Sequence, residues 1–347
     1  MKRPKSSSLD PLLTENYNFK LPDNLIAKEP ASPKDSAKLM VYNRATKEIT
    51  HSNFSEIENF LPDDCAILFN NTKVIKARLF GTKNTGGKVE LLINRPLEEN
   101  LIEVFIRGKV HEGTRLNFDN NLEAEVVYLH ENGARDVLFF ENRMTIDFER
   151  LTEVLENIGH IPLPPYIDRE DKQSDTQNYQ SVFAKHSGAV AAPTASLHFT
   201  KELFESVTST HRHEYITLHV GAGTFKPVES KIITEHPMHS ESYYIDENAK
   251  ALVESSQKLL AVGTTVTRTI EYYVRYKKSY GEANLFLHLQ NRPQRVNYLL
   301  TNFHLPKSTL LMLVSSFVGL DEMHRLYSEA IKEKYRFYSY GDAMLIL

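Results

Sequence analysis

The stretch YITLHVGAGTF, residues 215–225, gives the first indication of the fold of this chain. Its apolar residues alternate as they do in a β-strand with one buried face, and the strand runs directly into a Gly-Ala-Gly turn. Strand ends followed by glycines are where α/β proteins hold nucleotides. A third glycine at the dinucleotide spacing and an acidic residue at the expected distance are missing, so a plain strand and turn remains the commoner explanation. The stretch therefore indicates an α/β fold and leaves its function open.

A second stretch, GAVAAPTASLHFT at residues 188–200, suits a ligand better than a core. Glycine and alanine allow main-chain amides to come close to a bound molecule, and Pro193 stiffens the turn between them. Thr194, Ser196 and His198 supply polar side chains. A tightly packed crossover is the alternative, and this stretch alone does not separate the two.

The pattern of apolar and polar residues changes along the chain. Short alternating segments recur from residue 73 to residue 147, which predicts a small antiparallel barrel or sandwich. Residues 12–72 mix short strands with turns, and after residue 147 strand-like runs alternate with helical patterns, as in an α/β body. The helical patterns cover residues 147–157, 200–207, 248–259 and 265–278. The predicted fold class is therefore α/β: a mixed-sheet α/β domain (residues 1–72 and 148–347, with residues 1–11 as a flexible extension) and an inserted all-β barrel-like domain (residues 73–147).

Composition excludes several classes of protein. The chain has 347 residues, of which 41% are hydrophobic and 25% charged, which is ordinary for a globular protein with room for two domains. Its one cysteine, Cys65, excludes disulfides and a three-cysteine iron–sulfur cluster, and it fits a reducing cytoplasm. The longest strongly apolar run, near residues 310–320, is too short to span a membrane, and the N-terminus lacks the apolar region of a signal peptide. We therefore expect a cytoplasmic protein without a membrane partner.

The charge balance limits how the chain can bind RNA. A net charge of −4 argues against a non-specific nucleic-acid coat protein, so positive charge would have to be concentrated locally. Each candidate cluster is more often a solvated face than an RNA contact. The clusters are Lys73, Lys76, Arg78, Lys83 and Lys88; Arg275, Lys277 and Lys278; Arg292 and Arg295; and Lys332, Lys334 and Arg336.

Five further motifs complete a pattern with the two stretches above. They are NNTKVIKARLFG (residues 70–81), GHIPLPPYI (159–167), EHPMHSE (235–241), TNFHLPKSTLLMLVSSF (301–317) and YRFYSYGDAML (335–345). Together the motifs closely resemble the S-adenosylmethionine:tRNA ribosyltransferase-isomerases of queuosine biosynthesis. The resemblance extends from about residue 12 to residue 347 in the family's order, so it covers nearly the whole chain.

The resemblance implies a transferase and isomerase that modifies tRNA. Such an enzyme transfers the ribosyl part of S-adenosylmethionine to an aminomethyl-deazaguanine base at the wobble position, giving epoxyqueuosine in tRNA, adenine and methionine. It implies S-adenosylmethionine as co-substrate, tRNA with its anticodon loop as partner, and no metal. We expect a monomer rather than a homodimer. The family's fold, an α/β domain interrupted by a β-barrel, agrees with the division of the sequence into residues 73–147 and the remainder.

The family's proposed mechanism asks for particular residue types. The sulfonium acidifies the C5′ proton, a base removes that proton, adenine leaves, the aminomethyl nitrogen attacks the opened sugar, and epoxide closure expels methionine. Histidine can serve as base and acid with little tuning, although each histidine could equally be a structural hydrogen-bonding group. On a strand, His239 and Glu241 would project to one face as a hydrogen-bonded pair. The candidate catalytic residues, all within the family-matching motifs, are His198, His219, His239, Glu241 and His304.

Donor binding is expected from residues in the same motifs and from Arg268, which follows the strand and turn AVGTT at residues 261–265. Ser308 is a predicted helix N-cap, which places Lys307 and His304 on the loop entering a helix whose N-terminus favours anions. Arg268 is the candidate for the donor carboxylate or a phosphate, and Asp342 could receive ribose hydroxyls or the amine, or cap a turn. The complete set of candidate donor-binding residues is Thr194, Ser196, Gly221, Gly223, Thr224, Arg268, Lys307 and Asp342.

Two departures from the family pattern affect these expectations. Ser196 stands where a glycine is usual, so the backbone there approaches its ligand less closely. Residues 284–297 replace a segment that usually carries Pro-Gly-Tyr and an aspartate, and Asn297 cannot act as a carboxylate.

Three other functions compete with this one. His236, His239 and Glu241 could form a zinc triad for metal-dependent hydrolysis, but their spacing fits no common zincin pattern. An RNA-binding module built on the barrel would not need several Gly- and His-containing loops lining one pocket. Methyl transfer from the same donor is disfavoured, because the glycine-rich loop and acidic residue of methyltransferases are not recognisable.

Overall fold

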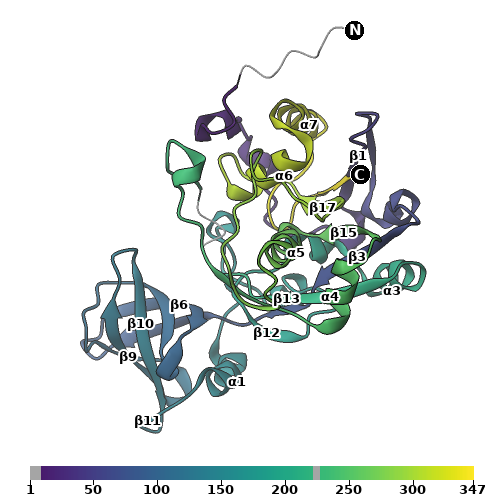
Figure 1. Ribbon diagram of the computed structural model, residues 1–347. Coiled ribbons are helices and arrows are strands. Elements are labelled where there is room, and N and C mark those ends of the chain that lie inside the picture. Colours follow the sequence, from purple (N-terminus) through teal and green to yellow (C-terminus); the bar gives the residue numbers. More distant parts are fainter. Residues whose placement is uncertain (1–8, 222–226) are drawn as a thin grey trace.

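The computed structural model describes residues 9–221 and 227–347, and its largest feature is a mixed sheet of nine strands (Figure 1). The central pairs β13–β3, β3–β15 and β15–β17 are parallel. In order across the sheet the strands are β16 (Tyr280–Ala283), β14 (Glu241–Ile245), β13 (His213–Leu218), β3 (Cys65–Asn70), β15 (Lys258–Val262), β17 (Tyr298–Asn302), β18 (Ala343–Ile346), β1 (Lys38–Tyr42) and β2 (Ile49–Asn53).

The middle of this sheet is covered on both faces. Every residue of β3 is buried, and its side chains alternate between two apolar cores, as the two-residue period of a strand requires. Ala66 and Leu68 join the core beneath α4, α5, α6 and α7, whereas Ile67 and Phe69 join the core beneath α3. A continuous apolar strand of this kind is typical of a sheet with helices on both sides. The helices on the sheet are α3 (Lys201–Thr210), α4 (Glu247–Glu254), α5 (Thr264–Tyr276), α6 (Thr309–Val318) and α7 (Leu320–Lys332).

The predicted helices begin close to the expected positions. Thr200, Asp246 and Ser308 cap α3, α4 and α6, because each side chain accepts a hydrogen bond from an amide in the first turn of its helix. The helix predicted over residues 248–259 ends earlier, at Glu254. The hydroxyl of Ser255 donates to the carbonyl of Leu252, and residues from Lys258 onward form β15.

The second sheet is a closed barrel of six antiparallel strands, which confirms the predicted barrel. The pairing of β9 with β10 closes the order β10-β7-β6-β5-β8-β9. Val89, Leu91 and Ile93 alternate along one strand into the barrel's apolar core. The strands are β5 (Arg78–Lys83), β6 (Lys88–Pro96), β7 (Ile102–Arg107), β8 (Arg115–Asn117), β9 (Leu122–Leu129) and β10 (Ala134–Glu141), with β11 (Met144–Thr145) added to β10.

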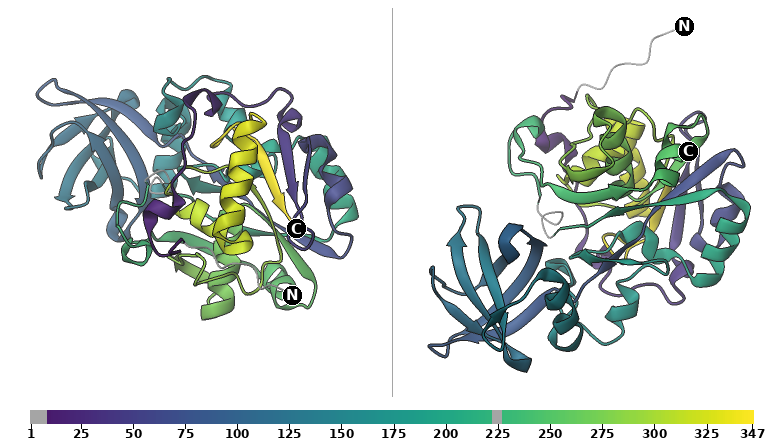
Figure 2. Two further views of the ribbon diagram at one scale, coloured as in Figure 1. Left: turned by 90° about the horizontal axis from the view of Figure 1, so that it is seen from above. Right: turned by 60° about the horizontal axis from the view of Figure 1, so that its bottom comes forward.

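The barrel lies to one side of the α/β body (Figure 2). Its strands follow one another in the chain between β3 and β13, so the chain leaves the large sheet, forms the barrel and returns. The segments that connect the two parts include a short parallel sheet of β4 (Thr72–Val74) and β12 (His186–Ala189) and the helices α1 (Phe148–Ile158) and α2 (Asp175–Asn178). Among the described residues, the helices are all too short or too polar to cross a membrane.

Candidate active site

A cavity opens at the carboxyl ends of β15 and β17, where α5 and α6 begin. It contains about 770 Å³ of empty space, part of which is open to solvent. Ligands of open α/β sheets bind in this position, outside the carboxyl ends of the strands. The lining residues are Tyr166, residues 191–195, Val220, residues 263–265, Arg268, residues 301–305, Ser308, Leu310, Tyr338 and Ser339.

Five of the seven sequence motifs meet at this cavity. The stretches 188–200 and 301–317 supply most of its wall, and residues 215–225 contribute Val220. The two remaining contributions come from Tyr166 and from Tyr338 with Ser339. The cavity is therefore built from segments that lie far apart in the sequence.

His304 is the predicted catalytic histidine that lines the cavity. It is 7% exposed, its Nε2 lies 2.8 Å from Oγ1 of Thr301, and its backbone amide donates to the hydroxyl of Tyr327 at 3.1 Å. Burial lowers the pKa of this imidazole to about 3, because desolvation penalises the charged form. His304 is therefore neutral at pH 7.

His198 lies behind the cavity wall. Its ring packs against Phe54 with a centroid separation of 4.9 Å, and its Nε2 lies 3.3 Å from Oδ1 of Asn302, a residue that lines the cavity. Burial lowers the pKa of His198 to about 4. This histidine supports the wall through Asn302.

His219 and His239 occupy other positions. Nδ1 of His219 lies 2.8 Å from Oγ1 of Thr72, and burial lowers the pKa of the ring. Gly188 has a φ of 147°, and a Cβ there would lie 2.9 Å from that ring, so only glycine fits beside it. His239 is exposed, and its ring centroid lies 6.4 Å from that of His236. The predicted catalytic histidines therefore do not converge on one cavity.

Glu241 and Arg268 form a buried ion pair. Nη1 of Arg268 lies 2.6 Å from Oε2 of Glu241, and the guanidinium also donates to the carbonyls of Leu285 and Ala283. The other oxygen of Glu241 accepts from the amide of Gly221 at 3.3 Å. The pair thus connects the start of β14 with α5 and with the loop after β13.

This arrangement corrects the predicted pairing of His239 with Glu241 on one strand face. β14 begins at Glu241, so His239 precedes the strand, and the alternation of strand side chains does not extend to it. Two other predicted residues, Gly223 and Thr224, lie outside the described residues.

The other candidate binding residues have partners within the protein. Asp342 is buried and accepts from the guanidinium of Arg336 at 3.0 Å and from the backbone amide of the same residue at 2.7 Å, so it caps a turn. Lys307 forms an ion pair of 2.5 Å with Glu15. Ser196 is fully buried, and no hydrogen-bond partner of its hydroxyl lies within the described residues. Thr194 lines the cavity.

Aromatic side chains form a wall of the cavity that the sequence analysis did not select. The ring centroids of Tyr166 and Tyr338 lie 3.9 Å apart, and the hydroxyl of Tyr166 is hydrogen-bonded to Ser339. Both tyrosines lie within quoted motifs, at residues 159–167 and 335–345, so the signal for them was present. No aspartate or glutamate from the described part of the chain lines the cavity.

A wider groove lies between the barrel and the body. It contains about 1490 Å³ of empty space, again partly open solvent. Val190 lines this groove and the next residue, Ala191, lines the cavity, so the two hollows share a wall. The lining residues of the groove are Arg78, Glu90, Leu92, Phe105, Arg107, residues 162–165, residues 168–170 and Val190.

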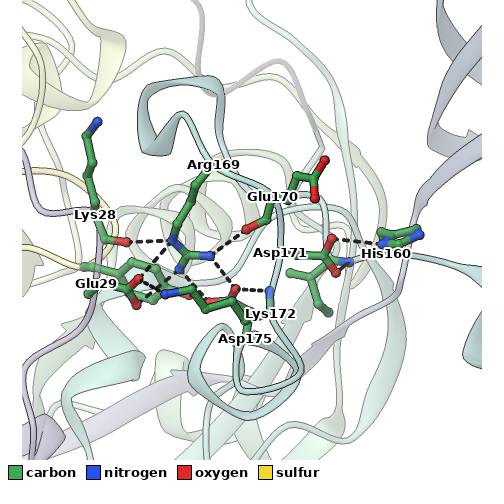
Figure 3. A network of polar contacts seen from close by, with 10 residues as sticks. Lys28, Glu29, His160, Arg169, Glu170, Asp171, Lys172 and Asp175 are labelled. Carbon is green, nitrogen blue, oxygen red and sulfur yellow. Dashed lines mark hydrogen bonds and ion pairs between the residues drawn. The ribbon is translucent and has the colours of Figure 1, made fainter.

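A polar network fixes the segment that separates the groove from the cavity (Figure 3). Asp175 is fully buried and accepts from both terminal nitrogens of Arg169, at 2.7 and 2.9 Å, and from the amide of Lys172 at 2.8 Å. The hydroxyl of Tyr340 donates to the same carboxylate at 2.9 Å. Nδ1 of His160 lies 2.9 Å from Asp171 in the same segment. The segment is thus held from two sides, by its own residues and by the motif at 335–345.

The zinc triad that the sequence suggested at residues 236–241 is not preformed in this structure. Among residues 9–221 and 227–347, the group whose candidate ligand atoms lie within 4.8 Å of one another is Glu103, His130 and Asp136, on the barrel. Glu103 is also bound by Asn94 and Arg95. The predicted triad at residues 236–241 is not such a group.

The chain is similar in sequence and in structure to known proteins. The model of a protein family described as queuosine biosynthesis protein matches residues 14–346. The chain is 60% identical over 337 residues to the S-adenosylmethionine:tRNA ribosyltransferase-isomerase of Sulfurimonas denitrificans, covering 97% of this chain and 98% of that protein. It is 59% identical over 339 residues to the protein of the same name from Nitratiruptor, covering 98% and 100%. The crystal structure of S-adenosylmethionine tRNA ribosyltransferase from Thermotoga maritima is similar, with a TM-score of 0.54, 33% identity and coverage of 96% of this chain and 100% of that one.

Proposed function

The chain belongs to the family of queuosine biosynthesis proteins, and from this premise we propose that the cavity at the ends of β15 and β17 is its active site. The protein is an S-adenosylmethionine:tRNA ribosyltransferase-isomerase. It transfers and isomerises the ribosyl moiety of S-adenosylmethionine onto the aminomethyl-deazaguanine base at the tRNA wobble position, giving epoxyqueuosine in tRNA, adenine and methionine. The observation that carries the choice of site is the meeting of five separate motifs around one cavity.

The wall of the cavity suits a sulfonium nucleoside. The rings of Tyr166 and Tyr338 line the cavity, and aromatic rings attract a cation by their quadrupole. Small residues at 191–195 leave main-chain groups close to the adenosine. Thr194 offers a hydroxyl on the same wall. The sulfonium would then lie near the tyrosines.

His304 is the base we assign to the C5′ proton. An imidazole accepts a proton only in its neutral form, and burial keeps this imidazole neutral at pH 7. When Nε2 carries the hydrogen and donates to Oγ1 of Thr301, Nδ1 keeps its lone pair for the substrate. The low pKa makes this imidazole a weak base, and the sulfonium, which acidifies the C5′ proton, reduces the basicity that the step requires.

The acceptor base reaches the donor from the groove. Phe105 offers a surface on which a base can stack. Arg78 is held by Glu90 at 2.7 Å, whereas Arg107 is 86% exposed and lies 3.5 Å from the same carboxylate, so Arg107 is the cation that can turn to a phosphate of the anticodon loop. Because Val190 and Ala191 line the two hollows in succession, a nucleotide in the groove lies next to the cavity. Both sites come from one chain, so the protein can act as a monomer. We also propose that it acts without a metal and in the cytoplasm, where its tRNA is found.

One labelling experiment tests the reaction. The protein is incubated with S-adenosylmethionine labelled in the ribose and with tRNA that carries the deazaguanine precursor. Label in the tRNA together with free adenine supports the assignment. A methyltransferase would instead transfer label only from the methyl group, and an RNA-binding module would consume no donor.

A further inference from the structure

We propose that the first turn of α5, together with the hydroxyl of Thr265, binds the carboxylate of the donor's methionyl group. The inference rests on the proposed function, because it assigns one part of the same cavity. It moves the predicted carboxylate site from Arg268 to residues one turn earlier in the chain.

The start of α5 is an uncapped helix end that faces the cavity. α5 has 13 residues, and its N-cap is Gly263, which has no side chain to accept from the first turn. Gly263, Thr264 and Thr265 all line the cavity. The amides of a helix N-terminus carry a partial positive charge and bind anions. By contrast, Ser308, which also lines the cavity, caps α6 and accepts from the amide of Leu311 at 3.2 Å.

Thr265 provides the second, independent observation. The residue is 8% exposed, and its buried Oγ1 has no hydrogen-bond partner in the part of the chain that the structure describes. Other threonines of the same helix are satisfied: Thr267 donates to the carbonyl of Gly263 at 3.2 Å, and Thr269 donates to the carbonyl of Thr265 at 2.9 Å. A buried hydroxyl without a partner is unfavourable, so its position in a cavity wall points to a ligand.

The position of this hydroxyl matches the helix end. A Cβ placed on Gly263 would lie 3.6 Å from Oγ1 of Thr265, so the hydroxyl is beside the first turn rather than further along the helix. One carboxylate could therefore accept from the hydroxyl and from the amides of the same turn. Hydrogen bonds to a charged acceptor are stronger than those between neutral groups.

The cations that the sequence suggested for this role are already paired. The guanidinium of Arg268 is bound to Glu241 at 2.6 Å, and Nζ of Lys307 is bound to Glu15 at 2.5 Å. Forming a new carboxylate contact with either cation would compete with an existing ion pair. The uncapped end of α5 requires no such exchange.

The test compares two donors on the full-length protein. Calorimetry measures the Kd of S-adenosylmethionine and of decarboxylated S-adenosylmethionine, which keeps the adenosine and the sulfonium but lacks the carboxylate. We expect the wild type to bind the first about tenfold or more tightly than the second. Thr265→Val is expected to lose about tenfold in affinity for S-adenosylmethionine and little for the decarboxylated donor.

Two further variants serve as controls. Thr265→Ser keeps the hydroxyl and should restore the discrimination, and Thr269→Val, on the same helix outside the cavity lining, should leave both affinities unchanged. Equal losses for both donors in Thr265→Val, or no loss, would overturn the inference. A loss confined to tRNA binding would overturn it as well and identify the anion as an RNA phosphate. If the wild type binds neither donor, the proposed function itself fails.

Discussion

At the scale of single residues, His304 differs from the other predicted catalytic histidines by its place in the cavity wall. We expect His304→Ala to lower kcat by about 10²- to 10⁴-fold, the usual contribution of a positioned acid or base. The affinity for S-adenosylmethionine should change much less, because the rest of the cavity stays in place. Single-turnover kinetics and calorimetry measure the two quantities separately.

His239→Ala is the matched comparison, since His239 was predicted with His304 but is exposed. This variant should keep most of its turnover. If His239→Ala loses turnover while His304→Ala keeps it, the base does not belong to the cavity.

Buried histidines also predict how stability depends on pH. The pKa of His198 is about 4 and that of His304 about 3, both lowered by burial, whereas an unfolded histidine titrates near 6.5. Below about pH 6.5 the unfolded chain binds protons that the folded chain excludes, so stability is lost as the pH falls towards 4. The loss should reach up to about 3 kcal/mol for His198.

Urea unfolding at several pH values between 7 and 4.5 measures this loss. His198→Gln, which has no titrating group, should show a flatter dependence of the unfolding free energy on pH than the wild type. An unchanged slope in the variant would mean that His198 is not the cause.

At the scale of secondary structure, the buried pair of Glu241 and Arg268 connects β14 to α5. Removing one partner leaves an uncompensated buried charge, so Glu241→Met and Arg268→Met should each cost about 3–5 kcal/mol of unfolding free energy. The double variant should recover most of this loss, because methionine fills similar space without a charge. Denaturant unfolding of the four proteins gives the double-mutant cycle.

An exposed pair provides the control for this cycle. Lys201 and Glu205 are 3.8 Å apart at side-chain exposures of 76% and 64%, and Glu205→Ala should cost less than about 1 kcal/mol. Strictly additive losses in the buried pair would contradict the expected coupling.

Helix starts and strand patterns are the features of secondary structure that the sequence could predict. Helix starts depend on local hydrogen bonds, so the N-cap at Ser308 was predicted correctly. The alternation in residues 73–147 predicted a barrel or a sandwich, and the structure has the barrel that the family resemblance implied. The closure of the barrel through β9 and β10 depends on pairing that no local pattern contains.

The candidate site was predictable only in part for a related reason. The motifs contained its residues, but the partners of Arg268 and Tyr166 lie 27 and 172 residues away, at Glu241 and Tyr338. The sequence therefore suggested ligand-binding roles for charged residues that form ion pairs within the fold.

At the scale of the whole molecule, the barrel and the body share the groove, and we propose that residues 73–147 form the inserted domain. Arg107 lines the groove from β7 with a side-chain exposure of 86%. We expect Arg107→Ala to weaken tRNA binding several-fold and to lower the slope of its salt dependence by about 1, with donor affinity unchanged. Filter binding at several salt concentrations measures both effects.

Arg143→Ala is the control, because Arg143 is an exposed arginine of the barrel that does not line the groove. An equal effect from both substitutions would mean that the barrel attracts tRNA only through its overall charge.

The position of β18 has a consequence for biosynthesis. This strand lies inside the sheet, between β17 and β1, and Tyr338 and Ser339 just before it line the cavity. During synthesis on the ribosome, β17 and β1 each keep an unpaired edge until residues 343–346 emerge and form the strand between them. A nascent chain that stalls before this point would expose two unpaired strand edges to chaperones and could not yet bind its nucleoside, so one strand completes both the large sheet and the donor cavity.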